Sequence, residues 1–259
     1  MPLEVKNHSH WSEITLKRPP RNILDTEMLT ALISAVDQLA EKAQPLVLRA
    51  EGKHFSTGYP IADIPPEIFH HDPDVRAATA FEQVMARIVN FPAPVVAVVQ
   101  GDAYGGAVEL LACADLRIAA TGVRLGVPPV RLGLVYSHTG LRRLLRGFGS
   151  TLVHELLYLG EAISAERARE AGFFNRVVAP DELAATLEKM MNSMVSGGPE
   201  ALRGTRRILH LLEENETLSP EMLREVGDLR QQSRGSDEFK RAREAFLNKK
   251  PSPFGNQND

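Results

Sequence analysis

The sequence predicts an α/β protein with a mainly parallel sheet and a helical C-terminal region. Between Thr15 and Gln100, apolar strand segments alternate with amphipathic helical segments, an order that requires right-handed crossovers between parallel strands. After Gly160 the strand patterns nearly vanish, apart from residues 175–178, and amphipathic helices follow one another. At 259 residues the chain is long enough to bury a large core in one main domain.

The individual elements are predicted from local patterns. Strands are expected at residues 3–6, 11–16, 45–50, 94–100 and 116–120. Helices are expected at residues 26–42 and 75–90, from residue 105, and from about residue 141. Asp25 can cap the first of these helices, whose apolar residues fall on one face.

The C-terminal region is predicted to be a helical appendage. Residues 220–235 and 237–250 are rich in charge, and no glycine–serine linker precedes them. Their spaced leucine, methionine and phenylalanine residues form apolar stripes, which can pack against another subunit or equally well against the same chain. We place the boundary between a core domain, residues 1–197, and a helical oligomerisation region, residues 198–259.

The composition excludes several classes of protein. An apolar fraction of 43%, a charged fraction of 24% and a net charge of −3 give no overall preference for nucleic acid or anionic membranes. The single cysteine, Cys113, excludes an intrachain disulfide framework, and no Cys/His cluster has the spacing of a zinc site. The sequence shows neither a signal-peptide pattern nor an apolar run of about 18–20 residues. We therefore expect a cytoplasmic protein with no metal, nucleic-acid partner or membrane association.

Two glycine-containing loops are candidates for holding an oxyanion. Residues 54–59 follow one expected strand, and residues 104–107 follow another. Ligand sites of open α/β sheets lie at the carboxyl ends of strands, so each loop can direct a backbone N–H into the same crevice. Two such donors form an oxyanion hole. The structural alternative is that both glycines serve only tight turns.

Glu109 is the candidate acid or base. Its apolar neighbours Val108, Leu110 and Leu111 indicate that it faces inward, where desolvation raises the pKa of a carboxyl group toward neutrality. The alternative is a carboxylate stabilised by the dipole of the helix that begins near Gly105.

A third cluster, residues 126–140, combines prolines and glycines with polar side chains. Ser137 or Thr139 can cap the following helix, and Tyr136 and His138 are candidates for the same crevice. Tyr136 is the better candidate, because a lone histidine in such a loop more often lies at the surface or caps a helix. The arginines at positions 142, 143 and 146 are expected on a solvated helix face, or in contact with phosphates.

Taken together, these segments resemble the crotonase, or enoyl-CoA hydratase/isomerase, superfamily over essentially the whole chain. The matching residues are 16–19 with Asn22, 55–61, 101–115, 132–134, Gly160 with Ala168 and Gly172, and 245–249. The resemblance implies a spiral of ββα repeats followed by helices that build trimers, often paired into hexamers.

The resemblance also implies roles for individual residues. The backbone N–H groups of Tyr59 and Gly106 would hold the carbonyl oxygen of an acyl-CoA thioester, and Glu109 matches one of the two catalytic glutamates of the hydratases. The second glutamate position is Pro129, which can neither accept nor deliver a proton. Ile61, Pro129, Ser137 and His138 are expected to line the substrate site. No cofactor is implied beyond the coenzyme A of the substrate.

Within the superfamily, residues 128–136 are most similar to the loop of methylmalonyl-CoA decarboxylase. That enzyme also has proline in place of the second glutamate and a tyrosine matching Tyr136, whereas its histidine at the first oxyanion position is Tyr59 here. We therefore favour decarboxylation of a malonyl-type thioester, carried by CoA or by a carrier protein. The alternatives are an isomerase, a hydratase or thioester hydrolase that uses Glu109 alone, and a non-catalytic acyl-CoA-binding or scaffold protein.

Overall fold

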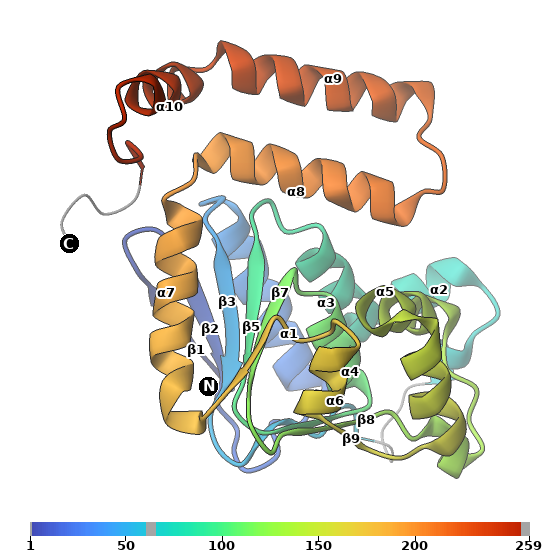
Figure 1. The fold of residues 1–259 in the computed structure, drawn as a ribbon. Coiled ribbons are helices and arrows are strands. Elements are labelled where there is room, and N and C mark those ends of the chain that lie inside the picture. The colour runs from blue at the N-terminus through green and yellow to red at the C-terminus, as the bar shows by residue number, and fades with distance from the viewer. Residues whose placement is uncertain (1, 61–65, 255–259) are drawn as a thin grey trace.

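The computed structural model describes residues 2–60 and 66–254, which form a two-sheet body and a helical arm (Figure 1). The strands are β1 Leu3–Asn7, β2 Ser12–Leu16, β3 Leu46–Ala50, β4 His54–Ser56, β5 Val95–Val99, β6 Asp102–Tyr104, β7 Leu116–Ala120, β8 Arg124–Gly126, β9 Ile163–Ser164 and β10 Arg176–Val178. The α-helices are α1 Thr26–Ala40, α2 Pro73–Ala77, α3 Ala80–Val89, α4 Gly106–Ala112, α5 His138–His154, α6 Ala165–Glu170, α7 Leu183–Val195, α8 Pro199–Glu214, α9 Pro220–Gly235 and α10 Asp237–Leu247. Shorter turns are η2 Pro66–Phe69, η3 Pro129–Leu132, η4 Glu155–Leu159 and η5 Pro180–Glu182.

The described strands form two sheets. The six-stranded sheet has the order β1-β2-β3-β5-β7-β10 and is parallel except for the β1–β2 hairpin. The four-stranded sheet has the order β4-β6-β8-β9, in which β4, β6 and β8 are parallel. The mainly parallel sheet predicted from the sequence is confirmed.

The ββα repeat is visible in the way the strands are shared between the sheets. In β3–β4, β5–β6 and β7–β8, the first strand joins the larger sheet and the second strand joins the smaller one. A helical segment follows each pair, namely α2 with α3, then α4, then α5. The chain therefore advances along both sheets at once, as expected for a spiral of ββα units.

The smaller sheet is the main feature that sequence patterns did not predict. Its strands have two or three residues each, as in β4 (His54–Ser56) and β6 (Asp102–Tyr104), and so short a segment shows no alternation of apolar and polar residues. The predicted helix at 75–90 is also two helices. It is interrupted at Thr79, whose side chain accepts the N–H of Glu82 and caps α3.

A continuous apolar core joins the larger sheet to its helices. All five residues of β5, Val95–Val99, are buried, as expected for a strand with elements on both faces. On α1, the buried residues are Met28, Leu29, Leu32, Ala35, Val36 and Leu39, which form the apolar face predicted from their spacing. The side chain of Asp25 accepts the N–H of Met28 and caps this helix as predicted.

Asn22 ties the loop after β2 to the segment that leads into the first candidate oxyanion loop. Its side chain is fully buried and donates to the carbonyls of Glu51 and His54 at 2.8 and 3.0 Å. Its backbone carbonyl accepts from the hydroxyl of Ser56 at 2.6 Å, and the same hydroxyl accepts the N–H of Gly58 at 3.0 Å. The position of Gly58 therefore depends on contacts with a loop 36 residues earlier in the chain.

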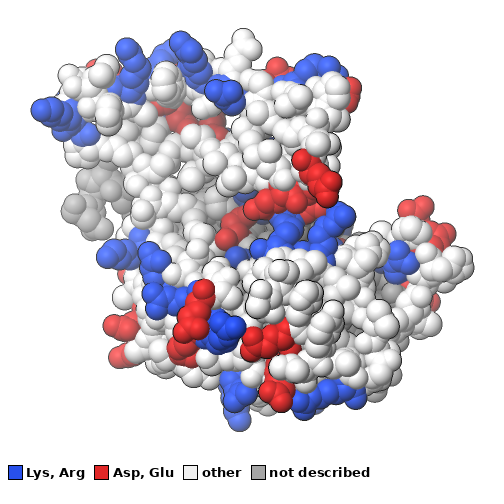
Figure 2. All heavy atoms as spheres, turned by 45° about the vertical axis from the view of Figure 1, so that its right-hand side comes forward, with Lys and Arg blue, Asp and Glu red and all other residues white. Residues whose placement is uncertain are grey.

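The helical arm α8–α10 extends away from the sheets (Figure 1). Among its described residues only Leu211 is buried, and ion pairs connect it to the body. Arg206 pairs with Asp115 at 2.7 Å, and Arg146 of α5 pairs with Glu213 and Glu214 of α8. Acidic and basic side chains gather where the arm meets the body (Figure 2). The arm begins at Pro199, and the domain boundary at residues 197/198 stays a prediction.

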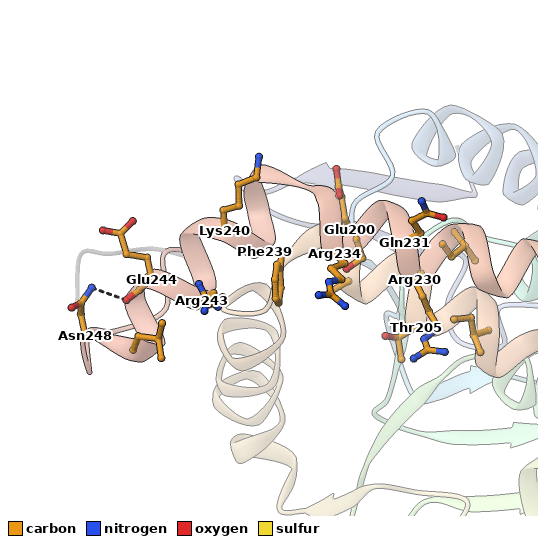
Figure 3. A pocket seen from close by; sticks show the side chains of 16 residues that line it. Glu200, Thr205, Arg230, Gln231, Arg234, Phe239, Lys240, Arg243, Glu244 and Asn248 are labelled. Carbon is orange, nitrogen blue, oxygen red and sulfur yellow. Dashed lines mark hydrogen bonds between the residues drawn. The ribbon is translucent and has the colours of Figure 1, made fainter.

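A groove of ≈ 1270 Å³ runs between α8, α9 and α10. Thr205, Arg230 and Phe239 lie along it (Figure 3). Large apolar side chains of the arm are also exposed: Leu209, Leu212, Leu223, Phe239, Phe246 and Leu247. Among the described residues, no helix combines the length and the apolar character that a bilayer span would need.

The contacts of Asn22 lead to a prediction about stability. Replacing Asn22 with alanine leaves two buried carbonyls and the N–H of Arg18 without their partner, and alanine adopts the φ of 46° at this position only with strain. We expect Asn22→Ala to lower the free energy of unfolding by about 3 kcal/mol in urea titrations. The control Asn90→Ala, at an exposed helix end, should cost about 0.5 kcal/mol. Equal losses for the two variants would contradict the structural role of Asn22.

Candidate active site

A cavity of ≈ 220 Å³ lies beyond the carboxyl ends of the parallel strands of the smaller sheet. The residues that follow β4, β6 and β8 line it: Thr57 and Tyr59, Gly105 and Gly106, and Val127 to Pro129. The parallel pairing of β4 with β6 and of β6 with β8 is what brings these three loops together.

Most of the predicted site residues meet in this cavity. Those that line it are Tyr59, Gly106, Glu109, Pro129, Tyr136 and Ser137. His138, the first residue of α5, is exposed and is not among the described lining residues. Ile61 lies outside the described residues.

The two candidate oxyanion loops approach each other too closely for any side chain at Gly58. A Cβ atom there would overlap the carbonyl oxygen of Tyr104 and lie 3.1 Å from the amide nitrogen of Gly106. The φ of +78° at Gly58 also favours glycine. Gly106 is the first residue of α4, where backbone N–H groups have no partner within the helix.

Phe81, on α3, packs against both candidate oxyanion loops. Its ring lies edge-on to the ring of Tyr59, with 5.8 Å between centroids and an interplanar angle of 77°. The same ring would be 2.6 Å from a Cβ atom at Gly106, so this position also requires glycine. Phe81 thus contributes to the spacing of the two loops, although nothing in its sequence context distinguishes it from other core residues.

Glu109 faces the cavity from α4, and its side chain is only 2% exposed. The Tyr136 hydroxyl donates to one carboxylate oxygen, Oε2, at 2.8 Å, and the Arg143 guanidinium donates to the other, Oε1. Burial raises the pKa of Glu109 above its ordinary value, and the ion pair with Arg143 and the hydrogen bond from Tyr136 oppose this increase. The inward orientation inferred from the apolar neighbours of Glu109 is therefore present in the structure.

Tyr136 is held against Glu109 by the start of α5. Burial, followed by the negative charge of Glu109, raises the pKa of Tyr136 well above its ordinary value. Gly140 makes the contact possible, because a Cβ atom there would overlap the Tyr136 ring and lie 2.7 Å from Oε2 of Glu109. Ser137 caps the helix by accepting the N–H of Gly140, which is one of the two caps predicted.

Arg143 and Glu82 are the residues that sequence reasoning missed. Arg143 was expected on a solvated face, but its side chain is 14% exposed and bridges Glu109 to Glu82 of α3, the latter at 2.7 Å. Although burial would lower it, the two carboxylates raise the pKa of Arg143. Arg143 follows Tyr136 by seven residues, about two helical turns, and this spacing could have placed the two side chains on the same side of the segment. No pattern in the sequence indicated that α3 lies beside α5.

The position of Gly140 gives a prediction. Gly140→Ala introduces a methyl group between Tyr136 and Glu109, so we expect a loss of about 1–3 kcal/mol in the free energy of unfolding, together with loss of activity. The control is Gly204→Ala in α8, where a Cβ atom meets nothing within 4 Å and the change should stabilise the helix by about 0.5–1 kcal/mol. Thermal unfolding followed by circular dichroism measures both. A Gly140→Ala variant as stable as the wild type would show that the two side chains do not pack as described.

Comparisons with known proteins agree with this fold. Residues 7–257 match the family model described as enoyl-CoA hydratase/isomerase. A "Probable enoyl-CoA hydratase" of Bacillus subtilis (strain 168) is 30% identical over 249 residues, 93% of each chain, and "Methylmalonyl-CoA decarboxylase" of Escherichia coli (strain K12) is 28% identical over 240 residues, 90% of this chain and 89% of that protein. The crystal structure of an enoyl-CoA hydratase from Mycobacterium smegmatis superposes with a TM-score of 0.85 at 28% identity, covering 98% of this chain and 99% of that one. The chain therefore belongs to the enoyl-CoA hydratase/isomerase, or crotonase, family.

Proposed function

We propose that this chain, an acyl-CoA-processing enzyme of the crotonase family, decarboxylates a malonyl-type acyl-CoA through an enolate. The observation that carries the proposal is the buried carboxylate of Glu109, which lines the cavity and is hydrogen-bonded to Tyr136, a second lining residue that carries a proton. Among the described lining residues Glu82 is the other carboxylate, and its partners, Arg143 and Thr139 at 2.7 and 2.8 Å, do not line the cavity. Pro129 lines the wall and offers no proton-transfer group.

The enolate would be stabilised by the two loops that approach each other at Gly58. In the proposal, the backbone N–H groups of Tyr59 and Gly106 donate to the thioester oxygen, on which negative charge develops. Loss of one such donor typically costs about 2.7–4 kcal/mol of activation free energy. The requirement for glycine at positions 58 and 106 supports this role, because any larger residue would disturb the spacing of the donors.

Decarboxylation needs no base in its first step. The bond between the α-carbon and the carboxylate breaks, its electron pair forms the enolate, and carbon dioxide leaves. Phe81, Val127 and Leu134 line the cavity, and such apolar walls disfavour the charge of the substrate carboxylate relative to the delocalised enolate. The volume of ≈ 220 Å³ suits a short acyl group.

The second step delivers a proton to the α-carbon. We assign this proton to the Glu109–Tyr136 pair, because burial favours the protonated form of Glu109. When Glu109 carries a proton, it donates to the Tyr136 oxygen and frees the hydroxyl proton of Tyr136 for the substrate. Transfer of both protons yields the saturated thioester, neutral Tyr136 and ionised Glu109, which regains its proton from water. The coenzyme A of the substrate is the only cofactor that this scheme requires.

The 28% identity to the methylmalonyl-CoA decarboxylase of Escherichia coli also supports the proposal. The 30% identity to a probable enoyl-CoA hydratase of Bacillus subtilis favours a second candidate, in which Glu109 alone activates water or moves a proton between carbons. Decarboxylation accounts better for Tyr136, since a hydroxyl that lines the cavity and is bound to the buried Glu109 carboxyl is suited to pass on its proton.

The proposal is tested by incubating the protein with malonyl-, methylmalonyl-, crotonyl- and β,γ-unsaturated acyl-CoAs and identifying the products by mass spectrometry. We expect decarboxylation, with a rate that falls as the pH rises through the pKa of Glu109, because the protonated form is the active one. Glu109→Gln and Tyr136→Phe should each lose about 10²–10⁴-fold in kcat. The control Tyr158→Phe, at an exposed tyrosine of η4, should retain full activity.

Two outcomes would overturn the decarboxylase assignment. One is efficient hydration of crotonyl-CoA that is abolished by Glu109→Gln but not by Tyr136→Phe. The other is binding of acyl-CoA without turnover of any substrate in the panel, which would indicate a binding or scaffold protein.

We further propose that α8–α10 assemble the chain into a homotrimer or a hexamer, in the cytoplasm. The exposed Leu223, Phe246 and Leu247, which are 57%, 82% and 62% exposed, offer an apolar surface for this contact. Light scattering should give a mass that is three or six times 28.5 kDa. Leu223→Glu combined with Phe246→Glu should reduce this mass, whereas Val5→Glu on the sheet body should not. A monomeric wild type would contradict the assignment.

A further inference from the structure

Arg143 lies between two carboxylates that come from different helices. Its Nη1 donates to Oε1 of Glu109 on α4, and its Nη2 donates to Oε2 of Glu82 on α3 at 2.7 Å. All three side chains are largely buried: Glu109 is 2% exposed, Arg143 14% and Glu82 16%. One guanidinium therefore fixes the relative positions of α3, α4 and α5 beside the cavity.

The start of α5 is organised to present this contact. Tyr136, Gly140 and Arg143 are separated by four and three residues, so they follow one face of the segment that enters α5. Tyr136 and Arg143 occupy the two oxygens of Glu109, and Gly140 leaves room for both. Thr139, on the adjoining position, donates to Oε1 of Glu82 at 2.8 Å.

This geometry fixes the direction of the Glu109 carboxylate. Arg143 binds Oε1 and is not among the described lining residues, whereas Tyr136 lines the cavity and binds Oε2, so the proton that the pair shares lies on the cavity side. Glu82 holds the far end of the guanidinium, so Arg143 cannot swing away from Glu109 without losing a second ion pair. A guanidinium makes such a two-sided contact, whereas an ammonium group lacks the fork geometry.

We propose that Arg143 is a positioning residue that holds Glu109 in its orientation toward Tyr136 and stabilises the carboxylate formed when Glu109 gives up its proton, with Glu82 as the anchor of Arg143. The catalytic consequence rests on the proposed function, in which Glu109 supplies the proton. The interaction of Arg143 with Glu109 can be measured without any turnover.

The two partners of the bridge act on Glu109 with opposite signs. The positive charge of Arg143 favours ionised Glu109 and lowers its pKa, whereas the negative charge of Glu82 raises it. Among the described residues, the other titratable or charged groups around the carboxylate are Tyr136 ahead of α5, Cys113 at the C-cap of α4, Tyr104 on β6, and Tyr59 and Arg76 in the cavity lining. Burial raises the pKa of Cys113 to about 12, so this thiol stays neutral.

The experiment titrates Glu109 directly in the full-length protein. Infrared spectra with isotope-labelled glutamate, minus the spectra of Glu109→Gln, isolate the carboxyl band of Glu109 as a function of pH. In Arg143→Gln we expect the midpoint to rise by about 1–3 pH units, and in Glu82→Gln, which keeps its shape and its oxygen acceptor, to fall by about 1 unit. Arg142→Gln is the matched control, since Arg142 is the adjacent residue of α5 and its side chain is 65% exposed.

Kinetic measurements then distinguish a positioning role of Arg143 from a role in protein stability alone. Arg143→Lys keeps the positive charge but not the forked geometry of the guanidinium. The titration midpoint of Glu109 in this variant should therefore stay close to that of the wild type, whereas kcat should fall about tenfold or more and KM should change little. In Arg143→Gln the alkaline limb of the decarboxylation rate should move to higher pH together with the infrared midpoint. Arg142→Gln should leave both unchanged.

The outcomes distinguish this inference from the proposed function. Opposite shifts for Arg143→Gln and Glu82→Gln support the bridge even if the wild type does not decarboxylate any substrate. Unchanged midpoints, or shifts of the same sign, overturn it even if decarboxylation is observed. Should Arg143→Gln fail to fold, Glu82→Gln and Arg143→Lys still decide. A Glu82→Gln midpoint that does not fall, or an Arg143→Lys midpoint that departs from that of the wild type, overturns the bridge.

Discussion

The buried carboxylate of Glu109 is the constraint on which the rest of the site depends. An ionised group at this depth is unfavourable unless it is paired and hydrogen-bonded, and here Tyr136 and Arg143 occupy its two oxygens. Both partners come from the segment that enters α5, which must therefore lie across the N-terminal half of α4. The glycine at position 140 and the cap at Ser137 are local conditions for that arrangement.

The second constraint is the close approach of the loops after β4 and β6. Parallel pairing of these short strands brings Gly58 to the Tyr104–Gly106 turn, and Phe81 packs on both Tyr59 and Gly106. Asn22 and Ser56 hold the first loop by buried hydrogen bonds to a distant segment. The spacing of the two loops is thus determined largely by main-chain packing, which is less easily perturbed than the position of flexible side chains.

The number of free carboxylates in the cavity bears on which reaction the site can catalyse. A cavity with two free carboxylates would be suited to hydration, because one can activate water while the other handles the proton at carbon. In this chain Pro129 lies in the wall, and Glu82 is bound by Arg143 and Thr139, just as Glu109 is bound by Arg143 and Tyr136. A crotonase fold can therefore be retained while the groups around Glu109 differ, and in the proposed function those groups select the reaction.

The sequence by itself determined the elements that have a clear period or a clear cap. The strand at 116–120, the apolar face of α1 with its Asp25 cap, and the inward orientation of Glu109 were all predicted from neighbouring residues, and the motifs around 54–61 and 101–115 indicated the family. The strands β4, β6, β8 and β9 were missed because two or three residues carry no period. Only the tertiary structure decided that Arg143 of α5 lies between Glu109 of α4 and Glu82 of α3, as a largely buried partner instead of a solvated residue. The physical reason is that the surroundings of Arg143 depend on helices 34 and 61 residues away in the chain, and no local pattern records which charge will lie opposite it.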